Sequence, residues 1–206
     1  MPRRKRHQDD GHDQSGQEYF RDPAGNNIRI IDLIRGKTLF NHIAELQLSH
    51  EAYTVQALPD ILARLVGCTE AMASLHDRGL THGDIRNDHI LVESDTGRYR
   101  WIDFDYTINY SDFDIWSMGN VLTYAVSKGI ITCRSAIRAG VELSEDDALL
   151  FYGYRVANVR KVHPHVPREL NDLLMRFSHG STDFVSSFDE LAEGLRVAAA
   201  ALRPAS

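Results

Sequence analysis

The clearest hydrophobic pattern in the chain runs through residues 58–78. The apolar positions that recur there at intervals of three and four are Ile61, Leu62, Leu65, Cys68, Met72 and Leu75. This spacing places the side chains on one face of a helix, and Gly79 provides a stop signal directly after it. The pattern predicts a long helix with one face in the core.

Two pairs of short strands are predicted outside that helix. Residues 19–21 and 28–31 flank a Pro-Ala-Gly-Asn-Asn turn, and residues 90–93 and 98–102 flank a Ser-Asp-Thr-Gly turn. Each segment is rich in β-branched or aromatic residues and is bounded by turn formers. We expect two antiparallel pairs.

Helical patterns dominate the remainder of the chain. Residues 38–46 suit a short helix, and everything after Asp112 has a helical pattern with breaks at glycines and prolines. A small β portion therefore precedes a larger helical portion. This order predicts an α+β fold rather than a parallel βαβ array.

The first 17 residues are polar, have no hydrophobic period, and are predicted to be a disordered tail. The basic cluster at residues 3–6 is followed at once by acidic residues, which favours a solvated segment over a nucleic-acid contact. We expect one domain over residues 18–202.

Composition narrows the classes of partner. Of the 206 residues, 43% are hydrophobic, and the formal net charge is −6. This charge does not favour nucleic acid or a membrane surface as a partner, and no apolar run approaches the roughly 20 residues that a membrane-spanning helix needs.

Cys68 and Cys133 stand in unrelated contexts. Two such cysteines predict free thiols in a cytoplasmic protein.

Acidic residues follow two of the predicted buried segments. Asp84 lies on a loop after the long helix, and Asp103 and Asp105 follow the strand at 98–102. Two carboxylate groups brought together at strand ends can hold a divalent cation and orient a hydroxyl nucleophile. The order of these residues predicts a catalytic or metal-binding site.

Several motifs, in the order expected, resemble the C-terminal lobe of the protein-kinase superfamily. They are HGD at 82–84, WIDFD at 101–105, DIWSMG at 114–119, and helical segments at 167–174 and 187–191. Upstream, residues 30–39 resemble the strand and hinge that follow the kinase N-lobe. The resemblance spans residues 28–195 and implies a kinase-like α+β fold, mainly the helical C-lobe with a two-strand remnant of the N-lobe. The HGD and IDFD forms are also found in aminoglycoside and choline kinases.

The resemblance assigns roles at the catalytic loop. Asp84 would be the catalytic base, and Arg86 would neutralise the transferring phosphate. Asp103, with Asp105 beside it, would bind Mg²⁺. Asp114 would brace the loop through hydrogen bonds to its backbone.

The resemblance also implies an ATP site. The backbone groups of Asp32 and Ile34 would face adenine, and Leu91 would form the floor beneath it. His89 stands where kinases place an Asn ligand to a second metal, and a phosphate contact or a structural role suits an imidazole better than Mg²⁺ coordination does.

Other departures from the kinase pattern concern regulation and phosphate binding. Only eleven positions separate Asp103 from Asp114, too few for a regulatory activation loop. The lysines before the catalytic loop are Lys5 and Lys37, and neither is expected to grip phosphates.

Three functions remain open from the sequence. The first is ATP- and Mg²⁺-dependent transfer of phosphate to a hydroxyl, either of a Ser/Thr protein substrate or of a small molecule. The second is an inactive pseudokinase that binds a protein partner. The third is a fragment whose N-lobe lies upstream.

Separately, His163 and His165 form a His-Pro-His pair that lacks Cys or acidic neighbours, so a surface turn is favoured over a metal site.

Overall fold

The computed structural model describes residues 18–105, 107–108 and 110–202, and the predicted tail at 1–17 lies outside them. The chain divides into two units, Met1–Arg35 and Gly36–Ser206. Each unit is described by itself.

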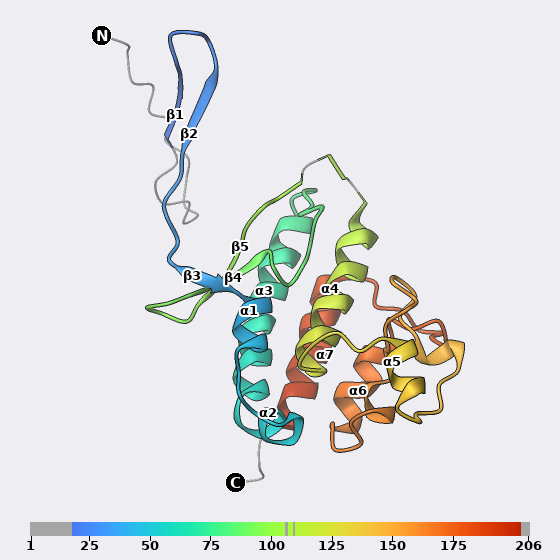
Figure 1. Ribbon diagram of the computed structural model, residues 1–206. Helices are drawn as coiled ribbons and strands as arrows, with labels where there is room; N and C mark the ends of the chain where they lie inside the picture. The colour runs from blue at the N-terminus through green and yellow to red at the C-terminus, as the bar shows by residue number, and fades with distance from the viewer. Residues whose placement is uncertain (1–17, 106, 109, 203–206) are drawn as a thin grey trace. The chain divides into compact units, whose positions relative to one another are not determined.

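The first unit contains a β-hairpin (Figure 1). Strands β1 (Glu18–Arg21) and β2 (Asn27–Ile30) are antiparallel. In the turn, Asp22 Oδ1 accepts a hydrogen bond from Asn26 N at 2.8 Å, and Gly25 has a φ of 88°. The turn residues therefore act as expected for aspartate and glycine, and the predicted strand pair is confirmed.

The second unit begins with a three-stranded antiparallel sheet in the order β3-β4-β5. Strand β4 (Ile90–Glu93) lies in the middle, between β3 (Gly36–Thr38) and β5 (Tyr99–Trp101). The pair β4–β5 was predicted from the sequence. Strand β3 was not, because three residues without alternating apolar positions give no local strand signal.

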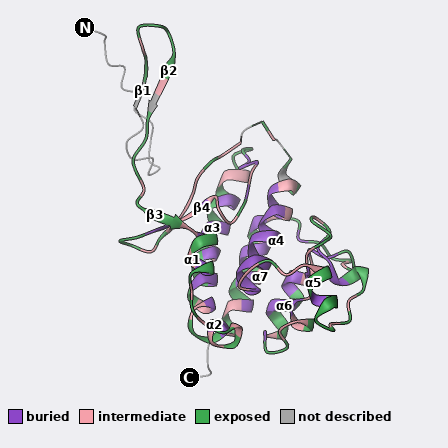
Figure 2. Ribbon diagram, viewed as in Figure 1, coloured by how far each residue is buried: buried purple, intermediate pink, exposed green. Residues whose placement is uncertain are grey.

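Three helices form the centre of the second unit: α3 (Leu58–His76), α4 (Ser111–Val126) and α7 (Phe188–Ala200). Helices α3 and α7 pack along each other, and α4 contacts α3 (Figure 1). Figure 2 shows buried residues concentrated on these helices. All the apolar positions of the 58–78 pattern are buried or packed against the core, so the prediction of a core-facing helix is confirmed.

Two shorter helices precede α3. Helix α1 (Leu39–Ala44) begins after Thr38, whose hydroxyl caps Asn41 N, and α2 (His50–Gln56) begins after Ser49, whose hydroxyl caps Ala52 N. Helix α2 was not predicted. Its seven residues present one buried aromatic side chain, Tyr53, which donates to the carbonyl of Ala125 at 2.7 Å.

The expectation that everything after Asp112 is helical is wrong for the middle of that region. Helices α5 (Cys133–Arg138) and α6 (Arg168–Met175) are separated by two short 3₁₀ turns, η1 (Glu145–Asp147) and η2 (Val159–Lys161), and by isolated β-bridges. Buried Asp147 organises this segment, since its carboxylate accepts hydrogen bonds from Ser144, Asn158 and Lys161. Such side-chain bonds compete with helix formation.

Both sheets are small and helices predominate, which confirms the α+β class. Across the described part of the chain, no helix combines the length and the apolar character needed to cross a membrane.

Candidate functional site

Asp114 holds the loop that carries Asp84. It lies in the first turn of α4 with no exposed surface, and its two carboxylate oxygens accept hydrogen bonds from His82 N at 2.7 Å and Gly83 N at 2.9 Å. His76 Nε2 lies 2.9 Å from the same carboxylate. The bracing role expected for Asp114 is therefore present in the geometry.

The two acidic loops are joined through their backbones. Asp105 N donates to the carbonyl of His82 at 2.8 Å. The approach is so close that a Cβ on Gly83 would lie 1.9 Å from the carbonyl oxygen of Asp105, and Gly83 has a φ of 79°. Only glycine meets both demands, because it has no Cβ and tolerates a positive φ.

Asp103 follows strand β5 by two residues and has a left-handed backbone with a φ of 57°. Aspartate is one of the few residues that adopts this conformation at modest cost. Its side chain is 70% exposed. The carboxylate is thus turned outward and accessible to a ligand.

His89 lies between the two carboxylates. Its Nδ1 is 2.8 Å from the backbone oxygen of Asp84 and 3.4 Å from the Asp84 carboxylate, while Nε2 is 4.0 Å from the carboxylate of Asp103. A carbonyl oxygen only accepts, so Nδ1 carries a proton. The imidazole therefore links the two acidic loops.

Asp105 makes a local turn. Its Oδ1 accepts hydrogen bonds from Thr107 N at 2.9 Å and from the Thr107 hydroxyl at 2.6 Å. The hydroxyl bond, followed by the backbone bond, lowers the pKa of this carboxyl. Asp105 is ionised at neutral pH, but one of its oxygens is already engaged.

His82 is buried beneath the loop that carries Asp84. Its ring stacks on Phe104 with centroids 4.2 Å apart, and Nδ1 accepts from Asp84 N at 3.3 Å. Burial lowers its pKa, and this outweighs the opposing effect of the nearby Asp114 carboxylate. A neutral, packed ring of this kind supports the loop.

Solved structures resemble this arrangement of elements. The kinase domain of Mycobacterium tuberculosis PknI matches with a TM-score of 0.60 and 16% identity, over 88% of this chain and 69% of that chain. Two substituted forms of the same domain match with TM-scores of 0.59 and 0.60, at 15% and 14% identity and with the same coverage. The chain has a protein-kinase-like fold. No family model and no curated protein sequence matches it.

In this kinase-like fold, Arg86 is engaged within its own loop. Its guanidinium makes a two-point contact with the Asp88 carboxylate, in which Nε lies 2.9 Å from Oδ1. This pairing raises the pKa of Arg86 and lowers that of Asp88. The Asp84 carboxylate is 3.9 Å from the same guanidinium. Arg86 thus stands beside the predicted base, with its charge shared between two carboxylates.

A pocket of about 410 Å³ opens beside the loop that carries Asp84. Its lining includes Asp84, Arg86, Asn120, Tyr152 and Arg155. Asn120 Oδ1 and Arg155 Nε are buried atoms without a hydrogen-bond partner among the described residues. These two atoms have almost no accessible surface and so do not face the pocket, but the charged, amide and phenol side chains of the lining suit a polar ligand.

The residues expected to hold adenine fall in different units of the chain. Asp32 is exposed and Ile34 half-buried in the segment after β2, in the first unit. Leu91 is half-buried in β4, in the second unit. The adenine site stays a prediction.

Two residues of the pocket lining, Tyr152 and Arg155, were not predicted from the sequence. Tyr152 and Arg155 lie in the irregular segment between η1 and η2, about seventy positions from Asp84, and no motif marks them. The one available signal was composition, since three aromatic residues and one arginine fall within residues 151–155.

Proposed function

We propose that this chain transfers a phosphoryl group from an Mg²⁺-bound nucleotide, ATP by resemblance, to a hydroxyl group. The support is the coupling of two carboxylates: Asp84 and Asp103 lie on loops that are joined by the His82–Asp105 backbone bond and by His89. Asp84 takes the proton of the acceptor hydroxyl, and Asp103 provides the oxygen ligand that Mg²⁺ prefers.

The donor set fits one magnesium ion and not two. The Asp103 carboxylate is exposed, so a cation can reach it from solvent. His89 stands where the resemblance expects the ligand of a second Mg²⁺ ion. Its Nδ1 is bonded to the Asp84 carbonyl, and an imidazole nitrogen is a poor ligand for Mg²⁺. When bound, Mg²⁺ would neutralise charge on the transferring phosphate. With its proton on Nδ1, a neutral His89 ring would offer Nε2 as a hydrogen-bond acceptor at the place of the second ion.

The pocket beside Asp84 is the proposed acceptor site. Its volume of about 410 Å³ is within the range of small-ligand pockets, which favours a small hydroxylated molecule over an extended peptide. Among the lining residues, the guanidinium of Arg155 can donate to an anionic or carbonyl group, and Tyr152 offers a hydroxyl. A Ser or Thr side chain of a protein remains the second acceptor class.

A binding module without catalysis is the competing function, and two observations favour it. Arg86 is paired with Asp88, and Lys37 Nζ lies 2.6 Å from Glu45, so both cations are occupied within the chain. In that case the pocket would hold a protein partner's side chain. A cytoplasmic location is part of both proposals, since Cys68 and Cys133 are free thiols.

Two measurements separate these functions. Thermal unfolding with Mg²⁺ and ATP should show stabilisation of about 2.7 kcal/mol at one hundred times the dissociation constant if the chain binds nucleotide. Phosphate transfer should then fall by at least about a hundredfold in Asp84→Asn and in Asp103→Asn. Asp172→Asn is the matched control, because Asp172 is an exposed carboxylate on α6. Turnover that survives in Asp84→Asn rules out the catalytic assignment, and the absence of any Mg²⁺–ATP shift favours the binding module.

A further inference from the structure

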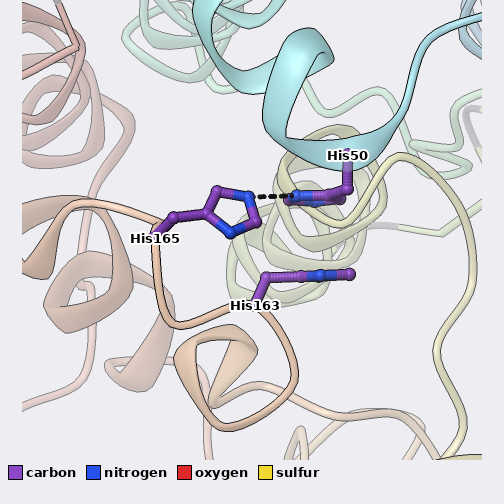
Figure 3. Close-up of side chains that lie close together, drawn as sticks. All are labelled: His50, His163 and His165. Carbon is purple, nitrogen blue, oxygen red and sulfur yellow. Dashed lines mark hydrogen bonds between the residues drawn. The ribbon is translucent and has the colours of Figure 1, made fainter.

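Three histidines from distant parts of the chain meet on the second unit. His50 is the first residue of α2, and His163 and His165 lie in the turn between η2 and α6 (Figure 3). One ring nitrogen of each lies within 4.8 Å of the corresponding nitrogen of the other two. The His-Pro-His pair therefore gains the third partner that its local sequence lacks.

The hydrogen bonds define the protonation of His50. Its Nε2 lies 2.9 Å from the carbonyl oxygen of Val126, and since a carbonyl only accepts, Nε2 carries the proton. The lone pair of neutral His50 is therefore on Nδ1, which faces His165 Nε2 at 2.8 Å (Figure 3). Metal-bound histidines are commonly oriented by such a bond from the second ring nitrogen to a backbone carbonyl.

Two rings of the cluster, His50 and His163, have lowered pKa values. Burial, followed by the neighbouring His163, lowers the pKa of His50 to about 4, and burial and His165 lower the pKa of His163. Neutral imidazoles hold lone pairs at neutral pH, which is the form that coordinates a metal. Lys128 is a further positive group that acts on His50, so a bound cation must gain its stability from direct coordination.

We propose that His50, His163 and His165 together bind one transition-metal ion, Zn²⁺ or an ion of similar chemistry, with the fourth position open to water. Three imidazoles and a water are an established ligand set for Zn²⁺, and an all-nitrogen set selects against Mg²⁺ and Ca²⁺. This site is separate from the carboxylates of the proposed phosphotransfer and does not depend on them.

Binding requires three specific adjustments of the rings and their protons. Two nitrogens on a tetrahedral Zn²⁺ lie roughly 3.3 Å apart, given Zn–N bonds of about 2.0–2.1 Å, so the 2.8 Å contact between His50 and His165 must widen. The proton that His165 donates to His50 moves through solvent to its own Nδ1, which leaves the total number of protons unchanged. His163, stacked on His50 at 3.5 Å and 7°, must rotate so that its lone pair points at the ion.

A bound ion would link two elements that are more than one hundred positions apart in the sequence. The ion would tie the start of α2 to the turn before α6. At one hundred times its dissociation constant, Zn²⁺ should raise the melting temperature by about 5–10 °C.

Cobalt provides the direct test, because tetrahedral Co²⁺ absorbs visible light and bound Zn²⁺ displaces it. The full chain is titrated with Co²⁺ in excess Mg²⁺, which saturates oxygen-rich sites. We expect one Co²⁺ per chain with a tetrahedral spectrum, loss of the band on Zn²⁺ addition, and at least about a hundredfold weaker binding in His165→Ala. His165 is exposed, so this variant should fold.

His179→Ala is the matched control, since His179 is an exposed histidine after α6. It should bind Co²⁺ as the unsubstituted chain does. The chain has 10 histidines, and an unchanged spectrum in His165→Ala would place the ion elsewhere and overturn the proposal. The absence of a tetrahedral band in the unsubstituted chain would overturn it equally. Circular dichroism confirms that each variant is folded.

Discussion

The backbone of Gly83 passes so close to Asp105 that neither a side chain nor an ordinary φ fits there. This contact and the carboxylate of Asp114 place Asp84 before any ligand arrives. Both effects act on individual residues, and both are testable by single substitutions with controls of the same chemistry.

Gly83→Ala should be far more costly than Gly140→Ala. Both glycines have a positive φ, 79° and 87°, but a Cβ on Gly140 meets nothing within 4 Å. The control should therefore lose about 1–2 kcal/mol from backbone strain alone. Gly83→Ala should lose a further ~1–3 kcal/mol because the two loops must separate. Urea unfolding measures the difference, and equal losses would show that the close approach is unimportant.

Asp114→Asn should destabilise the chain by about 2–4 kcal/mol. Both carboxylate oxygens of Asp114 now accept a hydrogen bond from a backbone N–H. In asparagine an NH₂ group replaces one of these oxygens and cannot accept that bond. Asp172→Asn removes an exposed carboxylate 3.6 Å from Arg168 and should change stability by less than about 1 kcal/mol. A loss in Asp114→Asn no greater than in the control would argue against the bracing role.

At the scale of elements, the contact between α2 and the turn before α6 makes stability sensitive to acid. The pKa of His50 falls to about 4 in the folded chain, against an ordinary value of 6.5. Between these values the unfolded chain binds a proton that folded His50 does not. The free energy of unfolding therefore keeps its full value above about pH 6.5 and falls as the pH drops toward 4.

His50→Gln should flatten this pH dependence. Unfolding at pH 7.5, 6.0 and 5.0, in a chelator, should show a smaller loss in the variant than in the unsubstituted chain. Part of the slope should persist, because His82 and His163 also have lowered pKa values. Parallel slopes for the two proteins would contradict the assignment to His50, which faces His163, His165 and Lys128.

Elements marked by a long periodic pattern or by turn residues on both sides were predictable, and short elements without either signal were not. The stripe at 58–78 predicted α3, whereas β3 and α2, with three and seven residues, depend on pairing and packing with distant residues. The two acidic loops were found because each carries a short continuous motif, at 82–84 and at 101–105. The pocket wall at Tyr152 and the meeting of His50 with His163 were not, because tertiary structure alone brings them together.

At the scale of the whole molecule, the second unit has a core of its own. Every residue in the buried hydrophobic cluster lies between Leu39 and Ala198. A chain of residues 36–206 should therefore fold, with a melting temperature within about 4 °C of the full chain. Calorimetry checks this, and a loss of cooperative unfolding would contradict it.

The same truncation tests the predicted adenine contacts. It removes Asp32 and Ile34 while it retains Leu91, Asp84 and Asp103. If the backbone groups of Asp32 and Ile34 contact adenine, the truncated chain should bind Mg²⁺–ATP about tenfold or more weakly, since one or two hydrogen bonds are lost. Unchanged affinity would place adenine elsewhere.

The left-handed backbone of Asp103 decides which substitutions are informative in a mutational scan. Asparagine adopts a positive φ nearly as readily as aspartate, so Asp103→Asn changes charge and leaves the backbone undisturbed. Valine or isoleucine at this position would report strain as well as lost charge. A fitness map of this chain would therefore show Asp103 as intolerant for two different reasons, and the asparagine variant separates them.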